Sequence, residues 1–368
     1  MRVLGFMTGT SLDAVDMAVL ETDGEAIQAF GPAGERKLTD ATRNLALEAT
    51  RAALAWPRGA PEPEIFARTA QAVAEEHFAA AAPFLAANGL AWSDLDLIGM
   101  HGQTVLQERP QDGQAGRTVQ LGNGAWLAAK TGTPVAFDFR AADIAAGGEG
   151  APLAPIYHLA RVRASGLELP VAVLNLGGVA NVTFCGADGR LAAFDTGPAN
   201  GMIDLLVQDR GAGRFDDGGR YASVGRVDAS ILTALLAHPY FQAPAPKSLD
   251  RHTFSLESLA RLQLEDAAAT LVAFTAESVR RGFELIGEAP REVIVCGGGR
   301  HNPQIMKALR ARLEAPVALA EDHGWRGDSI EAEAFAYLAA RCVKALPISF
   351  PATTGVKAPM TGGRVARP

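Results

Sequence analysis

Apolar and polar positions follow the same pattern in two stretches of the chain. Residues 3–24 read VLGFMTGTSLDAVDMAVLETDG, and residues 171–189 read VAVLNLGGVANVTFCGADG. Each stretch has an apolar run, a turn rich in glycine and small polar residues, and a second apolar run that leads to Asp-Gly. Asp-Gly between apolar runs favours a β-hairpin, because both residues tolerate a positive φ. The pattern predicts two hairpins, each followed by a further strand, at residues 26–30 and 191–194.

Apolar residues at helical spacing, with capping residues before them and helix-ending residues after them, predict the helices. The expected helices cover residues 40–56, 64–88, 226–237, 255–286, 302–313 and 329–345. Continuous apolar runs at 95–100 and 293–299 predict buried strands, and the first leads into His101-Gly-Gln-Thr. We expect these polar residues just beyond the carboxyl end of their strand, where ligands bind in open α/β sheets. The tail at 351–368, rich in Gly, Pro and Thr, is expected to wrap around a lobe without regular structure.

The length and composition indicate a two-lobed globular protein. The chain has 368 residues, of which 48% are hydrophobic and 7% are aromatic, and such a length exceeds one ordinary domain. We expect a first lobe at residues 1–140 and a second at 141–344, with the tail at 345–368 packing back on the first. The segment at 137–155, which mixes charged residues with glycines, is the expected crossing between the lobes.

Charge, hydropathy and cysteine content bear on the partners and the cellular compartment of the protein. The net charge of -7 argues against a dedicated nucleic-acid-binding protein. No apolar run approaches the roughly 20 residues of a membrane span, and Asp13 and Asp16 come too early for a signal peptide. The cysteines (Cys185, Cys296 and Cys342) are far apart and form no CxxC pair, which favours a reducing compartment. We expect a cytoplasmic protein that binds neither nucleic acid nor membranes.

The two hairpin turns are candidate phosphate sites. The turn at residues 7–13 offers backbone N–H groups and small hydroxyl side chains to a phosphate, and Asp13 and Asp16 are candidates to hold Mg²⁺ through water. An ordinary hairpin with a polar turn would explain this copy alone, but the second copy at 175–178 favours phosphate binding. The glycines at 297–299 fit a nucleotide lying against the backbone, a dinucleotide turn, or close helix–strand packing, and GxGxxG spacing is absent.

A few polar side chains are candidates for catalysis or binding. Asp195, expected at the end of a strand, suits a general base, although Asp before Thr-Gly-Pro is also typical of a turn. His101 fits a structural histidine better than a catalyst, with Gln103 beside it as a substrate contact. Lys247 and Arg251 form a basic patch that either steers anions or belongs to a solvated loop.

Long motifs, which cover nearly the whole chain, resemble those of the anhydro-N-acetylmuramic acid kinase family. They are MTGTSLDAVD (7–16), HGQT (101–104), DFRAADIAAGGEGAPLAP (138–155), NLGGVANVT (175–183), FDTGPANGMIDLL (194–206), PKSLDR (246–251), VCGGGRHNPQIM (295–306) and GDSIEAEAFAYLA (327–339). The resemblance implies an α/β, two-lobed actin/hexokinase-like fold with duplicated ribonuclease-H-like domains around a central cleft. It also implies a homodimer.

The resemblance implies a coupled reaction in peptidoglycan recycling. The enzyme would open 1,6-anhydro-N-acetylmuramic acid hydrolytically and phosphorylate O6 with ATP, giving N-acetylmuramic acid 6-phosphate and ADP. Asp195 would be the catalytic base. Asp13 would contribute to a Mg²⁺ site through water.

The resemblance also assigns binding residues. The ATP contacts would be Gly9, Thr10, Ser11, Leu12, Asp13, Ala14, Val15, Asp16, Gly177, Gly178, Gly297, Gly298 and Gly299, the last three on the adenosine side. The sugar contacts would be His101, Gln103, Arg140, Asp143, Glu149 and Glu331.

Three residues depart from the family pattern, and two other functions are open to such a chain. Ala14 and Ala199 stand where the pattern has glycine, and Glu149 stands where it has glutamine. An alanine fits only where φ is negative, and Glu149 adds negative charge near an anionic sugar. The other functions are a kinase of an ordinary sugar or carboxylate with the same superfold, and a non-catalytic nucleotide-switch module.

Overall fold

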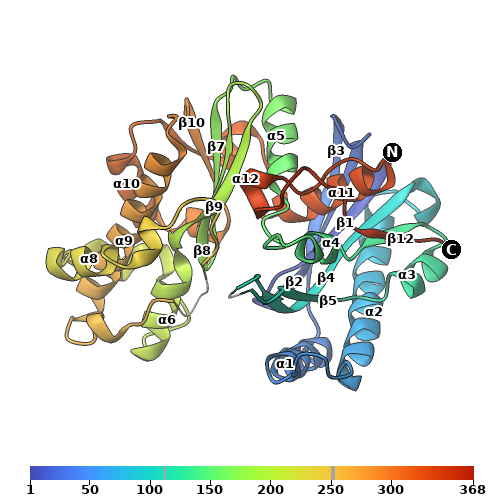
Figure 1. Cartoon of the computed structure of the whole chain (residues 1–368), viewed down its shortest axis with the longest axis horizontal. Helices are drawn as coiled ribbons and strands as arrows, with labels where there is room; N and C mark the ends of the chain where they lie inside the picture. The colour runs from blue at the N-terminus through green and yellow to red at the C-terminus, as the bar shows by residue number, and fades with distance from the viewer. Residues whose placement is uncertain (112, 250–252) are drawn as a thin grey trace. The chain divides into compact units, whose positions relative to one another are not determined.

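Two β-sheets, each built on one of the predicted hairpins, organise the chain (Figure 1). The computed structural model describes residues 1–111, 113–249 and 253–368. These residues form two units: unit 1 contains Met1–Ala164 and Ser329–Pro368, and unit 2 contains Ser165–Asp328.

The sheet of unit 1 has the strand order β12-β6-β4-β1-β2-β3, and β5 pairs with β4. Its strands are β1 (Arg2–Thr8), β2 (Ala14–Thr22), β3 (Ile27–Lys37), β4 (Leu97–Glu108), β5 (Arg117–Leu121), β6 (Val135–Phe137) and β12 (Arg364–Ala366). The strands β1, β2 and β3 are successive antiparallel partners, and β4 and then β6 are added in parallel beside β1. The first predicted hairpin is confirmed as β1–β2.

The sheet of unit 2 repeats this arrangement, with the order β11-β10-β7-β8-β9. Its strands are β7 (Val171–Leu176), β8 (Val179–Cys185), β9 (Leu191–Pro198), β10 (Glu292–Cys296) and β11 (Val317–Leu319). The first three are antiparallel, and β10 and β11 are added in parallel beside β7. The predicted α/β class and the duplication are confirmed.

The helices of unit 1 include those expected at 40–56, 64–88 and 329–345. The helices of this unit are α1 (Asp40–Leu54), α2 (Glu64–Ala87), α3 (Gly124–Thr131), α4 (Ala141–Ala145), α5 (Pro155–Ala164), α11 (Ile330–Val343) and α12 (Pro351–Thr354). The Thr39 side chain caps α1 by accepting from the Thr42 N–H. The glycine pair Gly5–Gly99 in β1 and β4 lets α11 lie directly on the sheet. A Cβ at these positions would come within 2.0 and 2.2 Å of backbone oxygens of α11.

The helices of unit 2 pack around one apolar core. They are α6 (Asn200–Asp209), α7 (Arg220–Val224), α8 (Ala229–Leu236), α9 (Leu264–Ile286) and α10 (Pro303–Arg312). Asn302 caps α10, and Pro303 takes its first position, as predicted. The helix expected at 255–286 begins only at Leu264, because Glu257–Leu259 forms a separate 3-10 turn. No helix in the described residues has the length and apolar character of a membrane span.

The units divide at different positions from the expected lobe limits, 140 and 344. Helices α5 and α11 both belong to unit 1. Tyr157 of α5 donates to the buried carboxylate of Glu333 in α11, and Arg161 of α5 lies 3.6 Å from the centroid of the Phe30 ring in β3. Through these contacts α5 and α11, which were both expected in the second lobe (141–344), belong to unit 1.

Two local predictions were wrong. The strand expected at 95–100 continues to Glu108, because β5 pairs with β4 beyond Gln103, so His101 and Gln103 lie inside the strand. The tail expected to be irregular contains α12, and its β12 pairs with β6.

Candidate active site

The β1–β2 turn in unit 1 presents small polar groups around a buried anchor. Leu12 has a φ of 57° and is only 5% exposed, and its N–H donates to the Gly9 carbonyl at 3.2 Å. Thr10, Ser11 and Asp13 are exposed. The turn thus offers hydroxyls and a carboxylate to a ligand, whereas the predicted contacts from Ala14 to Asp16 lie in β2.

The buried His77 contacts the end of β1, next to this turn. The His77 Nε2 lies 2.9 Å from the Thr8 Oγ1 at the end of β1, and the His77 ring stacks on Phe6. Burial lowers the pKa of His77 to about 3, so the ring is neutral at physiological pH. His77 therefore fixes the last residue of β1 and carries no charge.

His101 holds Arg140 within unit 1. The Arg140 Nε donates to the His101 Nε2 at 3.1 Å, and the His101 Nδ1 lies 2.7 Å from the Gly102 carbonyl oxygen. A guanidinium only donates and a carbonyl only accepts, so His101 is the neutral tautomer with its proton on Nδ1. Burial, followed by the charge of Arg140, holds the pKa of His101 well below its usual range. Both ring nitrogens are occupied, so His101 positions Arg140 and has no free nitrogen for acid–base catalysis.

Arg140 is surrounded by acceptors and carboxylates. Its Nη1 donates to the Gly150 carbonyl at 2.8 Å. Burial lowers the pKa of Arg140 to about 10, against the opposing charges of Glu331 and Asp143. The guanidinium stays charged at neutral pH, and the structure brings these predicted sugar contacts together in unit 1.

Asp143 links α4 to the loop after it and to α12. Its side chain is 1% exposed; Oδ1 accepts from the Gly150 N–H at 2.6 Å and Oδ2 from the Thr354 hydroxyl at 2.6 Å. The Glu149 N–H donates to the Thr354 carbonyl at 2.8 Å. The sequence analysis missed Thr354, because its proximity depends on the fold of the tail.

Gln103 connects β4 with the β1–β2 turn. Its side-chain amide donates to the Thr104 carbonyl at 3.2 Å and more weakly to Gly9 at 3.5 Å. Its Oε1 is buried and accepts no hydrogen bond within the described part of the chain. A buried acceptor in this position suits a donor group on a ligand.

Three segments of unit 2 lie close together: the β7–β8 turn, the start of α6 and the glycines that follow β10. The N–H groups of Asn200 and Gly201, at the start of α6, donate to the carbonyls of Gly177 and Gly178 at 3.0 and 3.1 Å. Gly297 follows β10 with a φ of 76°, and a Cβ there would lie 2.2 Å from the Asn175 Oδ1. The segments at Gly177–Gly178 and Gly297–Gly299, both predicted to contact ATP, therefore lie close together in unit 2.

A cavity of about 400 Å³ adjoins these segments in unit 2. It is lined by Asn200, Ile203, Asp204, Phe215, Asp216, Asp217, Gly218, Gly298, His301 and Asn302. The sequence analysis missed Asp204, although this residue follows Asn200 by one helical turn and so shares its face of α6. Burial, together with the charge of Asp216, raises the pKa of Asp204 to about 6.

Asp195 lies inside β9, not at its end as predicted, because β9 continues to Pro198 in its pairing with β8. Gly197 pairs with Ala180 and Asp195 with Asn181, which leaves a bulge between them. Such bulges re-aim side chains near active sites. The Asp195 Oδ2 accepts from the Leu249 N–H at 2.7 Å, and this hydrogen bond orients the carboxylate.

Lys247, one of the two residues of the expected basic patch, lies inside the fold. Lys247 is buried, and its Nζ donates to the Tyr240 carbonyl at 2.9 Å, so it is not part of a solvated loop or an exposed attractor of anions. The Tyr240 hydroxyl donates to the Asp195 carbonyl. Arg251 lies outside the described residues.

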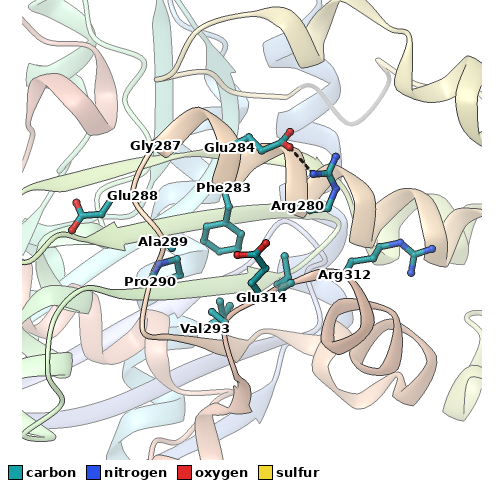
Figure 2. A pocket seen from close by; sticks show the side chains of 12 residues that line it. Arg280, Phe283, Glu284, Gly287, Glu288, Ala289, Pro290, Val293, Arg312 and Glu314 are labelled. Atoms are coloured by element: carbon teal, nitrogen blue, oxygen red, sulfur yellow. Dashed lines mark hydrogen bonds and ion pairs between the residues drawn. The ribbon is translucent and has the colours of Figure 1, made fainter.

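A second cavity in unit 2, of about 320 Å³, contains none of the predicted residues. Figure 2 shows the Phe283 ring at its centre, the Glu314 carboxylate beside it and Arg280 directed toward Glu284. Arg280 pairs with Glu277 at 2.7 Å and with Glu284 at 2.6 Å. Since this guanidinium is already neutralised, the cavity does not suit a polyphosphate.

Comparison with known proteins identifies the family. The model of the family "Anhydro-N-acetylmuramic acid kinase" matches residues 1–367. The chain belongs to this family. It is 77% identical to the anhydro-N-acetylmuramic acid kinase of Phenylobacterium zucineum (strain HLK1) over 368 residues, which cover 100% of both chains. It is 68% identical over 365 residues to that of Caulobacter vibrioides (strain ATCC 19089 / CIP 103742 / CB 15), covering 99% of this chain and 98% of the relative.

Two departures from the anhydro-N-acetylmuramic acid kinase pattern are compatible with the backbone. Ala14 begins β2 opposite Lys37 and is not among the residues of positive φ, which in this turn is Leu12. Ala199 has a φ of -126°. Neither alanine has a left-handed conformation, so neither carries the cost of a positive φ. The Glu149 carboxylate, the third departure, is partly exposed.

Proposed function

We propose that the protein uses ATP to open 1,6-anhydro-N-acetylmuramic acid with water and to phosphorylate its O6. The products are N-acetylmuramic acid 6-phosphate and ADP, within peptidoglycan recycling in the cytoplasm. Family membership over residues 1–367 is the observation that carries this proposal. The acceptor is thus a small molecule, and neither nucleic acid nor a membrane takes part.

Asp195 is the proposed base. Water attacks C1 of the sugar and gives a proton to the Asp195 carboxylate, while the C1–O6 bond breaks and its electrons remain on O6. O6 then attacks the γ-phosphorus, and the bond to the β-phosphate oxygen breaks to release ADP. The hydrogen bond from the Leu249 N–H to Oδ2 supports this role, because it orients the carboxylate and stabilises its charge.

The glycine-rich turns are the proposed phosphate contacts. In unit 1 these are the residues from Gly9 to Asp16, and in unit 2 they are Gly177–Gly178 and, on the adenosine side, Gly297–Gly299. Exposed backbone N–H groups of such turns bind anions. The arrangement around Asn200 and Gly297 supports a nucleotide that lies close to the backbone.

A magnesium ion fits the first turn. The Asp13 carboxylate is exposed, and within the described residues no set of three or more His, Cys, Asp or Glu side chains is placed to hold a metal. Mg²⁺ typically takes one or two carboxylates, waters and substrate phosphates, so a single carboxylate here is sufficient. When bound, the ion would neutralise charge on the transferred phosphoryl group.

The polar groups of unit 1 are the proposed sugar site. The proposed contacts are Gln103, Arg140, Asp143, Glu149 and Glu331, and His101 acts by positioning Arg140. Arg140 supplies a positive charge suited to the lactyl carboxylate of the sugar, and the buried Gln103 Oε1 supplies an acceptor for a hydroxyl or amide donor. We also propose a homodimer, as the family resemblance implies.

An isotope experiment tests the reaction. The protein is incubated with ATP, Mg²⁺ and the anhydro sugar in ¹⁸O-water, and we expect 6-phosphorylated product with one solvent oxygen at C1. The Asp195→Asn variant should lower kcat by about 10²–10⁴-fold, the range for loss of a general base. Product without solvent oxygen would exclude the hydrolytic mechanism, and phosphorylation of ordinary hexoses or acetate alone would replace the proposed acceptor.

A further inference from the structure

The Asp204 carboxylate lines the 400 Å³ cavity, and no hydrogen bond to it is found in the described part of the chain. Its neighbour Asp216 is satisfied, because it accepts from the N–H groups of Tyr221 and Ala222 at 2.8 and 3.2 Å. No N–H or O–H of the described residues donates to Asp204, which is half-buried and repelled by the charge of Asp216. A half-buried carboxylate in this state is stabilised by a ligand that donates hydrogen bonds.

The negative charge of the cavity determines which part of a nucleotide it can bind. Asp204, Asp216 and Asp217 all line it, so phosphate oxygens are repelled. Groups that carry O–H or N–H donors suit these carboxylates, and the hydroxyls of a ribose are such groups.

The position of the cavity agrees with this chemistry. Asn200 and Gly298 line it, and the Asn200 N–H donates to the Gly177 carbonyl in the second hairpin turn. A nucleotide whose phosphates lie at this turn would place its nucleoside in the cavity. Phe215, which is 52% exposed at the cavity wall, offers a ring face for the base.

We propose that Asp204 accepts hydrogen bonds from the ribose hydroxyls of ATP and thereby selects ribonucleotides over deoxyribonucleotides. This assignment rests on the proposed ATP-dependent function and goes beyond it, because it names a residue that determines nucleotide specificity. Asp204 acts in binding and does not touch the reacting phosphorus. The role requires the carboxylate and not merely a polar side chain of similar size.

Calorimetric titration with ADP, 2′-deoxyADP and 3′-deoxyADP, each with Mg²⁺, tests the assignment. A hydrogen bond to a charged group corresponds to about tenfold or more in affinity. The wild-type protein should bind ADP at least tenfold more tightly than one of the deoxynucleotides. Asp204→Ala should weaken ADP binding about tenfold and bind all three nucleotides within about a factor of two.

Asp209→Asn is the matched control. It removes the same charge from the same helix at an exposed position, where the nearest cation is Arg210 at 3.9 Å. It should keep the wild-type order of affinities, and thermal unfolding of each variant confirms that it is folded. Equal wild-type affinities for the three nucleotides, or an equal loss for all three in Asp204→Ala, would overturn the role of Asp204 alone. A folded wild-type protein that binds none of them would contradict the ATP-dependent function as well.

Discussion

Arg140 donates from Nε to the His101 Nε2 at 3.1 Å, and His101 in turn lies against the Gly102 carbonyl at 2.7 Å. His101 belongs to β4, so this hydrogen bond fixes the Arg140 guanidinium, which is proposed to bind the sugar, relative to that strand. We therefore expect changes at His101 to affect sugar binding more than the rate of the chemical step.

His101→Ala removes the acceptor of the Arg140 Nε. We expect KM for the anhydro sugar to rise about tenfold, with a smaller change in kcat, because a displaced guanidinium weakens sugar binding without contacting the reacting atoms. Steady-state kinetics give both constants. His101→Gln, whose Oε1 can accept the same hydrogen bond, should recover part of the loss; a fall in kcat at unchanged KM would instead place His101 in the chemistry.

The protonation of His101 should not contribute to the pH dependence of activity. Burial and the charge of Arg140 hold its pKa well below the usual range, so it stays neutral as the pH rises or falls around neutrality. The profiles of kcat/KM for wild type and His101→Gln should therefore have the same shape between about pH 6 and 9. An acidic limb near pH 6.5 that is present in wild type and lost in the variant would contradict this prediction.

Local signals made the duplicated hairpins predictable. Asp-Gly and the adjacent apolar alternation act over a few residues, and Asp23-Gly24 and Asp188-Gly189 join the antiparallel pairs β2–β3 and β8–β9. The extent of β4 was not predictable in this way, since its second half depends on pairing with β5 from later in the chain. The limits of unit 1 depend on α11, which lies on β1 although it is far from β1 in sequence.

The residues of the candidate site also differ in whether local sequence or distant contacts determine their positions. The glycine turns are local and were found, whereas Thr354 reaches Asp143 only through the fold of a distant segment. Thr354 has no motif of its own that marks it. The positions of Asp195 and His101 inside strands also follow from nonlocal pairing and could not be inferred from their neighbours.

Thr354→Val should destabilise unit 1. It leaves the buried Asp143 Oδ2 without the hydroxyl that donates to it at 2.6 Å. We expect the free energy of unfolding to fall by about 1–3 kcal/mol, measured by urea denaturation. Thr354→Ser keeps the hydroxyl and should lose clearly less; a loss in Thr354→Val no larger than that in Thr354→Ser would show that the hydrogen bond to Asp143 contributes little to stability.

Gly297→Ala should impair nucleotide binding beyond the effect of backbone strain. Its φ of 76° disfavours alanine, and its Cβ would lie 2.2 Å from the Asn175 Oδ1 and 2.7 Å from the Leu176 carbonyl oxygen. Gly287 has a similar φ of 72° but no atom within 4 Å of its Cβ, so Gly287→Ala isolates the strain. We expect ADP affinity to fall at least about tenfold in Gly297→Ala and to stay near wild type in Gly287→Ala. Similar affinities in the two variants would show that the close approach is not needed for binding.

Asp204→Asn should stabilise the protein at neutral pH and not at acidic pH. Burial and Asp216 raise the pKa of Asp204 from 3.8 to about 6, so the folded state binds this proton more tightly than the unfolded state. Asp217 and His301 face the same cavity. Stability from this group is therefore complete below about pH 4 and is lost as the pH rises through about 6.

The Asp204→Asn variant has no carboxylate at this position and so avoids this loss of stability. At about pH 7.5 we expect it to exceed wild type by about 1 kcal/mol in free energy of unfolding, a figure reduced for the partial exposure of the carboxylate. The difference should shrink between about pH 6 and pH 4 and disappear below that range, as followed by urea denaturation at each pH. Asp209→Asn, from the exposed end of the same helix, should show no comparable trend. A stabilisation by Asp204→Asn that did not change with pH would mean that the repulsion from Asp216 is not its cause.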